Sequence, residues 1–458
     1  MRGRKKLLLS MVFSIGLGLP AFAQTYTRAD LGHSLTDFGA IQAGSADGLV
    51  PAYTGGINNI PNLPHGSPST GWPNPFANEQ PLFVVTKENM SKYAAMLTPG
   101  VQAMLERYGD KGFVLNVYPS HRTATYPEWV LNNTLKNAQT AQLTVDGEGV
   151  TGAYGGIPFP VPANAYEAMW DYNLSYMPAS CSDLHQAYVV YPNGSSTFLG
   201  TITNRFATPY YDQQKTTLTS NYYKYFIAAF YTPASQAGVA FLWEYPMDFD
   251  QSSGVTTYFY SPGTRRTRLA PDFAYDTPVA SYGGAINYDE IYFFQGKMDK
   301  FDFKLVGRKE MIIPYNDFDM DNNTESELNH PYFVDPKLTR WEVHRVWVIQ
   351  ATLKPNERHI YEKWNFYIDE DSWKILLSES YDHSGNIYKV GIGFPWSTYG
   401  EGDATTTDSD TYAIFDLSKD DYALNTVYTH GSGYFHCSVA APDMLKFSPQ
   451  TLSMQAIQ

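Results

Sequence analysis

Short runs of apolar residues fill the second half of the chain, and their spacing is typical of β-strands. The segments YYKYFIAAFY (222–231) and GVAFLWEY (238–245) are apolar at both alternating sets of positions. A strand with two apolar faces has to be covered on both sides. The pattern therefore predicts two buried strands, and Trp243 lies in the second of them.

The segment WEVHRVWVIQATL (341–353) alternates more strictly. Apolar residues such as Trp347 share one set of positions with Arg345, whereas acidic and polar residues occupy the other set. This period of two predicts a strand whose faces differ in polarity. Residues 358–390 predict three further strands, because the turn-forming sequences DEDS and DHSG interrupt them.

Helical signals precede most of these strands. Thr86 is suited to cap a first short helix, and Thr98 with Pro99 supplies the N-cap and the first-turn proline of a second. A third helix is expected over residues 128–138, directly after a proline. A fourth should begin near Asn164, after a loop rich in glycine and proline.

Residues 24–85 are rich in Gly, Pro and Asn, which prevents long helices or strands there. The same stretch contains Tyr53, Trp72 and Phe76, and a disordered tail seldom carries such residues. We therefore expect an irregular arm laid over a core. Because no repeat or linker interrupts the strands, we expect residues 24–458 to form a single β-rich α+β domain.

A Pro-Gly turn inside YFYSPGTRRTRLAPD (258–272) predicts a β-hairpin. The hairpin carries the densest positive charge outside the start of the chain: Arg265, Arg266 and Arg268. Alternation would place Arg265 on the opposite face from the other two. Burying an unpaired guanidinium costs roughly several kcal/mol, so these groups should lie at a rim or pair with acids such as Asp272 or Asp276. The alternative is that they only neutralise neighbouring carboxylates.

Composition supports an extended sheet, since 43% of residues are hydrophobic and 36 tyrosines and 26 phenylalanines are present. Residues 1–23 have a basic start, a short apolar core and Ala-Phe-Ala at the end, which is the layout of a secretory signal peptide. The full chain has a formal net charge of −14. Residues 1–23 contribute four positive charges and no negative charge, so the rest of the chain carries −18. A chain this acidic disfavours nucleic acid as a partner. No cysteine lies at the expected cleavage point, where a lipid would be attached, so we expect a soluble periplasmic protein without a lipid anchor.

The sequence contains two cysteines, Cys181 and Cys437. An oxidising compartment would allow them to pair, but nothing local in the sequence brings them together. Both a disulfide and two free thiols therefore remain open from the sequence.

Sequence motifs for catalysis are missing. There is no G-x-S-x-G, no H-E-x-x-H and no phosphate-binding loop, so we expect neither an enzyme nor a cofactor. His121, Asp369 and Glu370 are titratable candidates for an alternative hydrolase, without a motif that relates them. The pair His121-Arg122, between two Tyr-Pro turns, reads either as a hydrogen-bonded loop anchor or as a contact site.

Metal signals are weak. DFDMDNNTESEL (317–328) spaces Asp317, Asp319 and Asp321 like the first ligands of a calcium loop, but Leu328 replaces the final glutamate. A solvated acidic loop is the simpler interpretation. His430, His436 and Cys437 could form a soft-metal trio, although isolated histidines are usually structural, so no metal site is expected.

Several segments occur in an order that resembles a known bacterial family: ADGLVPAYTGG, NPFANEQPLFVVT, YPSHRTATYP, GGIPFPVP, YSPGTRRTRLAPDFAYDTP, KLVGRKEMIIPYN, HRVWVIQATLK and RHIYEKWNFYIDEDSW. The family is one of unknown function that is similar to outer-membrane lipoprotein-sorting proteins. This resemblance implies a fold like that of LolA and LolB, in which helices cover the concave side of a curved, unclosed antiparallel half-barrel. The chain is much longer than LolA, and its arm and insertions could reshape the cavity.

The resemblance also implies a carrier or chaperone for a lipid or another hydrophobic cargo. An inner-membrane exporter of the resistance-nodulation-division type, or an outer-membrane protein, would be its partner. Alternatives are a hydrolase of envelope lipid or glycan, and a non-catalytic accessory partner of an exporter. The residues expected to contact cargo or partner are Arg265, Arg266, Arg268, His121, Arg122, Trp243 and Trp347.

Overall fold

The computed structural model describes residues 26–251, 254–320, 325–428 and 433–455. The expected signal segment, residues 1–23, lies outside the described residues. Within the described ranges, no helix has the length and apolar character required to cross a bilayer.

A sixteen-stranded sheet organises the described chain, with the order β1-β2-β12-β13-β14-β15-β18-β19-β5-β6-β7-β8-β9-β10. In addition, β11 pairs with β12 and β20 pairs with β5. The strands of this sheet are β1 (Phe83–Val85), β2 (Leu115–Val117), β5 (Ser180–Val190), β6 (Ser196–Ala207), β7 (Tyr222–Thr232), β8 (Ala240–Pro246), β9 (Thr256–Ser261), β10 (Arg266–Leu269), β11 (Phe301–Pro314), β12 (Trp341–Leu353), β13 (Lys363–Asp369), β14 (Ile375–Tyr381), β15 (Ile387–Gly393), β18 (Tyr412–Asp416), β19 (Asp421–Val427) and β20 (Tyr434–Ser438). Neighbouring strands are antiparallel, except where β2 meets the start of β12.

Two small two-stranded sheets lie beside the main sheet: β3 (Gln142–Leu143) with β4 (Val150–Thr151), and β16 (Trp396–Ser397) with β17 (Thr407–Asp408). The α-helices are α1 (Pro99–Tyr108), α2 (Glu128–Thr140), α3 (Ala165–Asn173), α4 (Glu325–Leu328) and α5 (Leu452–Gln455). Short 3-10 helices are η1 (Arg28–Asp30), η2 (Ile57–Asn59), η3 (Met90–Met96), η4 (Gly109–Lys111), η5 (Pro209–Tyr211), η6 (Ala280–Tyr282), η7 (Tyr288–Phe293), η8 (Phe318–Met320), η9 (Gly402–Ala404) and η10 (Met444–Lys446).

The expected helix starts are confirmed at two caps. The Thr98 side chain accepts a hydrogen bond from the Val101 amide, and the Asn164 side chain accepts one from the Glu167 amide. The helix expected after Thr86 is only the 3-10 helix η3. Thr98 precedes a proline and is therefore held in an extended conformation, which ends any helix before it.

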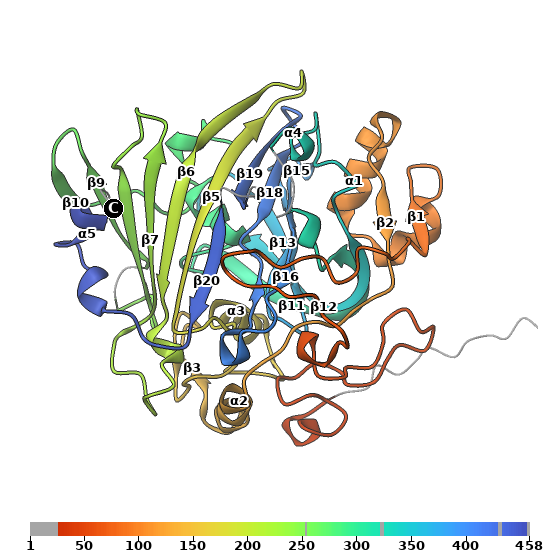
Figure 1. The fold of residues 1–458 in the computed structure, drawn as a ribbon, viewed down its shortest axis with the longest axis horizontal. Helices are drawn as coiled ribbons and strands as arrows, with labels where there is room; N and C mark the ends of the chain where they lie inside the picture. Colours follow the sequence, from red (N-terminus) through yellow and green to blue (C-terminus); the bar gives the residue numbers. More distant parts are fainter. Residues whose placement is uncertain (1–25, 252–253, 321–324, 429–432, 456–458) are drawn as a thin grey trace, which may run out of the picture.

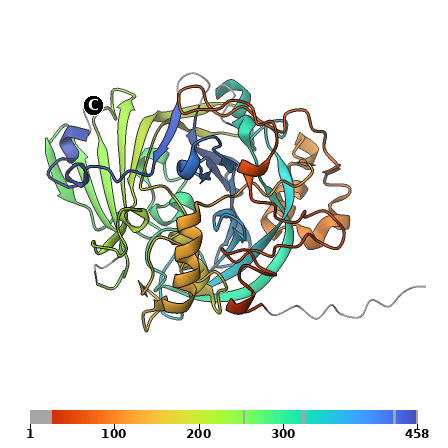
Figure 2. The same ribbon diagram turned by 60° about the horizontal axis from the view of Figure 1, so that its bottom comes forward.

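The sheet is curved and unclosed, so the expected β-rich α+β fold is confirmed (Figure 1). Helices α2 and α3 lie at one end of the strands, on the concave side (Figure 2). Their buried residues join the core on that side, together with side chains from 271–299. Helix α1 packs on the opposite face, against β14 and β15.

Strands β7 and β8 are covered on both faces, as their two apolar sides predict. Phe226 and Trp243 belong to the concave core. On the other face, Leu242 packs in a cluster with Phe447 and Leu452 of the C-terminal segment. The polar positions Glu342 and His344 in the first half of β12 are buried too, whereas Gln350 is half-buried and Thr352 is exposed.

The irregular arm expected at the N-terminus is present over residues 26–82. Trp72 donates a hydrogen bond from Nε1 to the carbonyl of Tyr399, and the arm residue Phe38 accepts one from Trp373. These contacts fasten the arm to the far end of the sequence. A disulfide joins Cys181 in β5 to Cys437 in β20, which are direct partners in the sheet register.

Candidate functional site

A row of aromatic rings crosses the concave face of β6–β9. Phe206 stacks on Phe226 at 4.8 Å between ring centres, and Phe226 stacks on Trp243 at 4.7 Å. The row continues from Trp243 to Phe241 at 5.2 Å and from Phe241 to Phe259 at 5.0 Å. Three of these four contacts join direct register partners on neighbouring strands, so antiparallel pairing itself builds the row.

The segment 271–297 returns over this row and encloses a cavity of about 390 Å³. Phe273 reaches the row through Phe259, at 5.9 Å between ring centres, and stacks on Tyr288 at 4.7 Å. Trp243, Leu269 and both of these segment residues line the cavity. Leu269 remains 55% exposed, so one side of the lining faces solvent.

Three buried polar atoms at this cavity have no hydrogen-bond partner among the described residues: Trp243 Nε1, Thr257 Oγ1 and Asp289 Oδ1. The other oxygen of Asp289 pairs with His359 Nε2 at 2.7 Å. Burial raises the pKa of Asp289. Buried polar groups in folded proteins are almost always paired, with protein or with a bound molecule. The cavity therefore combines apolar walls with three polar atoms that could still form a hydrogen bond.

The arginine hairpin forms the rim of the row. Arg265 lies in the turn rather than in β10, with φ of 52°, and its amide donates to the carbonyl of Ser261. Its expected place on a strand face is therefore wrong, because the turn takes up one more residue. Arg268 pairs with Phe259 in the register, and its guanidinium lies 5.4 Å from that ring centre.

The three hairpin arginines are exposed. Within the described ranges, none of them makes an ion pair with Asp272 or Asp276; the latter accepts a hydrogen bond from the Ile360 amide instead. Two placements were expected for these arginines, a position at a rim or ion pairs with the two acids. The exposed side chains correspond to the first of these. The structure thus brings Trp243 and Arg268 to the same aromatic row.

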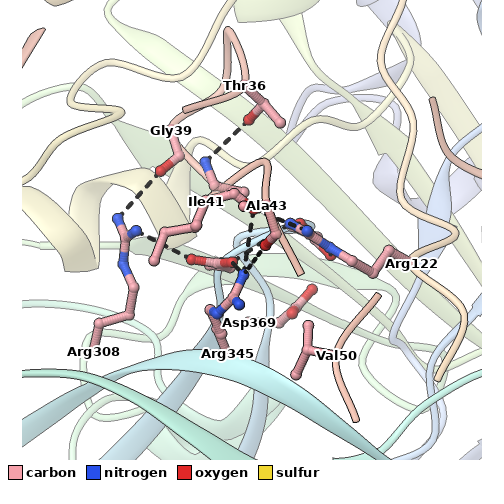
Figure 3. Close-up of polar contacts among 12 residues, drawn as sticks. Thr36, Gly39, Ile41, Ala43, Val50, Arg122, Arg308, Arg345 and Asp369 are labelled. Atoms are coloured by element: carbon pink, nitrogen blue, oxygen red, sulfur yellow. Dashed lines mark hydrogen bonds and ion pairs between the residues drawn. The ribbon is translucent and has the colours of Figure 1, made fainter. Parts of the chain in front are cut away.

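Arg122 lies in a different place, a buried ionic cluster beneath the arm (Figure 3). Its Nε and Nη2 donate to the two carboxylate oxygens of Asp371 at 2.8 and 2.6 Å. Glu370 forms ion pairs with Arg122, Arg308 and Arg345 at 3.4, 3.3 and 3.7 Å. Three arginines and two acids therefore meet here, four of the five more than nine-tenths buried. Glu310 supplies a third acid to Arg345 at 3.0 Å.

Arm carbonyls close the ionic cluster from above. They accept hydrogen bonds in three pairs: Gly39 from Arg308 at 3.2 Å, Ile41 from Arg122 at 2.8 Å, and Ala43 from Arg345 at 2.8 Å. Arg308 also lies over Trp347, 4.2 Å from its ring centre. For Arg122 and Trp347 this geometry favours a role in anchoring the arm.

The same cluster contains the acids considered for a hydrolase. Burial and the charge of Asp371 raise the pKa of Asp369 to about 6, and burial raises the pKa of Glu370 to about 7. His121 lies apart from them, with its Nε2 2.7 Å from Glu79 and its ring stacked on Phe76 at 4.1 Å. None of these groups lines the aromatic cavity.

Among the residues that the structure describes, one group of side chains could hold a metal ion: His344, Asp369 and Asp371, whose ligand atoms lie within 4.8 Å of one another. Both oxygens of Asp371 already accept hydrogen bonds from Arg122. A cation there would have to displace a guanidinium group, so the residues fit a metal poorly. Sequence analysis did not identify this group, because the DEDS stretch is also an ordinary turn.

The acidic loop 317–328 is only partly described. Asp317 is buried and accepts a hydrogen bond from the Arg340 amide at 2.6 Å, and burial raises its pKa well above the usual range. Asp319 accepts a hydrogen bond from Asn74. Asp321 of this loop lies outside the described residues, and so does His430 of the histidine trio.

Comparison with known proteins places the chain in a family. The profile described as "Protein of unknown function (DUF1329)" matches residues 84–453. The uncharacterised protein PA3922 of Pseudomonas aeruginosa is 37% identical over 369 residues, which cover 79% of each chain.

Three solved structures match the chain at low sequence identity and with TM-scores below 0.5. A DUF1329 family protein from Desulfovibrio piger matches with a TM-score of 0.42 and 11% identity, covering 63% of this chain and 97% of its own. An outer membrane lipoprotein-sorting protein domain from Vibrio parahaemolyticus gives 0.41 and 12%, with the same coverage. A LolA superfamily protein from Nitrosomonas europaea gives 0.35 and 10%, covering 63% and 98%. Because the family profile spans most of the sequence and the Pseudomonas relative shares 37% of its residues, the chain belongs to the DUF1329 family.

Proposed function

We propose that the protein is a periplasmic carrier that binds a lipid or another hydrophobic cargo in the cavity beside Trp243. The observation that carries this proposal is the cavity of about 390 Å³, whose wall includes Trp243 and the stacked rings of Phe273 and Tyr288. The signal-like start of the sequence and the disulfide support an exported protein in an oxidising compartment.

The energetics of such a cavity suit an acyl chain. Each methylene removed from water contributes about 0.8 kcal/mol, so a chain of a dozen carbons would bind firmly even after the cost of immobilisation. The unused polar atoms of Trp243, Thr257 and Asp289 could fix the position of an ester or hydroxyl group. A hydrolase would need titratable groups to converge on the bound chain. The candidates His121, Asp369 and Glu370 lie in other parts of the fold.

A blocking substitution tests this proposal. Ala274 lines the cavity, whereas Ala280 on the same segment is exposed and does not. Ala274→Trp should weaken binding of the neutral hydrophobic probe N-phenyl-1-naphthylamine by about tenfold or more, because the indole fills the space. Ala280→Trp adds the same ring outside the cavity and should bind like the wild type.

Two further measurements decide the outcome. Native mass spectrometry of protein purified from a periplasm should show a co-purifying hydrophobic molecule, and extraction should identify it. If neither the purified protein nor the delipidated protein binds any hydrophobic molecule, the carrier proposal is wrong. Equal probe binding by both tryptophan variants would place the site elsewhere.

A further inference from the structure

A second cavity lies on the concave side and is lined by two half-buried lysines. Its volume is about 60 Å³, and Lys224 of β7 and Lys374 at the start of β14 both line it. Aromatic residues form half of the remaining wall, among them Tyr245 and Tyr292. The residues come from segments far apart in the sequence, so no sequence motif marks this site.

Neither lysine has an ion pair within the part of the chain that the structure describes. The ammonium of Lys224 lies 4.2 Å from the ring centre of Tyr245, which offers a π-face but no charge. Burial, with the charge of Lys374 as a smaller cause, lowers the pKa of Lys224 to about 8. Burial lowers the pKa of Lys374 as well. The two ammonium groups are therefore short of compensating charge.

One carboxyl lines the cavity, that of Asp410. Burial and the neighbouring Asp183 raise its pKa to about 6. Its Oδ2 has no hydrogen-bond partner among the described residues. Asp408, outside the cavity wall, also acts on Lys374, but burial raises the pKa of Asp408 well above its usual range and so favours its uncharged form. Two cations thus face one acid in the cavity wall, and an anion entering the cavity would complete the neutralisation.

The lysine cavity adjoins the outer cavity, because residues are shared between the walls of the spaces that separate them. Tyr292 lines both the lysine cavity and a space of about 70 Å³, and that space shares Trp243 and Tyr288 with the outer cavity. Gln295 lines both the lysine cavity and the outer cavity. A molecule that is charged at one end and apolar along the rest would match a cavity with two lysines followed by spaces with aromatic walls.

The partition between these spaces is η7, whose backbone is unusual. Tyr292 and the following Phe293 have φ of 54° and 74°, the left-handed region that bulky residues rarely adopt. Such residues cost on the order of 1–3 kcal/mol each and persist where the surroundings hold them. Tyr172 contributes by donating a hydrogen bond to the carbonyl of Phe294 at 3.1 Å.

We propose that Lys224 and Lys374 bind the anionic oxygen head, a carboxylate or a phosphate, of an amphiphilic cargo whose apolar chain runs past Tyr292 toward Trp243. This inference rests on the proposed carrier function and names the class of its cargo. A cavity of about 60 Å³ suits a compact head group, whereas the chain needs the adjoining spaces. Ammonium groups act as point charges, so either anion satisfies them.

Pairs of probes that differ only in charge test the inference. Delipidated protein is titrated near neutral pH with hexadecanoic acid, its methyl ester and hexadecyl phosphate, by displacement of N-phenyl-1-naphthylamine. We expect at least one of the two anions to bind about tenfold or more tighter than the ester. Lys224→Met combined with Lys374→Met should abolish this preference while affinity for the ester stays within about twofold.

Controls separate charge from folding. Lys224→Arg combined with Lys374→Arg keeps both charges and should retain part of the preference. Lys92→Met removes an exposed lysine and should change nothing. If the double methionine variant does not fold, the wild type still provides a test: its preference for the acid should fall as pH rises through about 8, since Lys224 then loses its proton.

Several outcomes would overturn the head-group site. Equal wild-type affinities for acid, phosphate and ester would disprove it and leave the carrier proposal intact. Inorganic phosphate that displaces hexadecanoate but not the ester would support an anion site and show that a free anion also occupies it. Failure of all the amphiphiles and of the neutral probe to bind would disprove both proposals together.

Discussion

The guanidinium of Arg268 lies 5.4 Å from the centre of the Phe259 ring, its register partner across the β9–β10 hairpin. This contact fixes one arginine at the end of the aromatic row that leads to Trp243. Arg265 and Arg266 beside it remain exposed and have no such ring contact among the described residues. The hairpin therefore joins an apolar wall to a positive rim.

Removal of the exposed charges of Arg265 and Arg266 should weaken binding but leave the stability of the fold nearly unchanged. Arg265→Ala combined with Arg266→Ala should lower the affinity for an anionic cargo or acidic partner, because the rim loses its bidentate donors. The free energy of unfolding should change by no more than about 0.5 kcal/mol per site, since both side chains are exposed. Urea denaturation and cargo titration measure the two effects.

Arg268→Ala is the matched comparison. It should cost about 0.5–1 kcal/mol, because it also removes the contact with Phe259. A double variant that unfolds more easily and binds normally would instead show that the two turn arginines have a structural role.

The disulfide should be essential for full stability. Cys181 and Cys437 are separated by 256 residues, so their link restricts a very long loop of the unfolded chain. Cys181→Ser combined with Cys437→Ser should lower the free energy of unfolding by about 2–5 kcal/mol. Thiol titration of denatured, unreduced protein should find no reactive thiol, and a result of two thiols would contradict the pairing.

The ionic cluster should hold the arm in place. Arg122→Ala leaves Asp371 buried without its bidentate partner, and removal of one member of a buried pair costs about 3–5 kcal/mol. Hydrogen exchange at residues 36–51 should increase in this variant. Arg28→Ala, which removes an exposed arm charge, should leave both measurements unchanged. Unaltered exchange in the Arg122 variant would disprove the anchoring role.

Stability should depend on pH through Glu370. Burial raises its pKa from 4.5 to about 7, so between these values the folded protein holds a proton that the unfolded chain has lost. The contribution of this group to the free energy of unfolding therefore falls as pH rises through that window. Glu370→Gln removes this contribution and leaves those of Asp369 and Asp410, whose pKa values are also raised, to about 6. Between pH 4.5 and about pH 7, the free energy of unfolding of the variant should rise by roughly 1–3 kcal/mol relative to that of the wild type. Urea denaturation measures this difference. A constant difference across the window would contradict the assignment.

Local features of the sequence determined much of the fold. The caps at Thr98 and Asn164 predicted where α1 and α3 begin, because a capping side chain satisfies amides only a few residues away. Two-faced apolar runs predicted β7 and β8, and the Pro-Gly turn predicted the arginine hairpin. Each of these caps, apolar runs and turns depends on a few neighbouring residues, so it can be recognised from the sequence alone.

The tertiary structure alone decided the chemistry of the interior. Arg122 meets Asp371 across 249 positions of sequence, and Lys224 shares a cavity with Lys374 and Asp410. Such contacts depend on how far the sheet curves and which strands become neighbours, which is the sum of many weak packing terms across the whole chain. No spacing of residue types records that sum. The sequence therefore specified the strands and their turns, and only the tertiary structure showed which charged side chains those strands bury together.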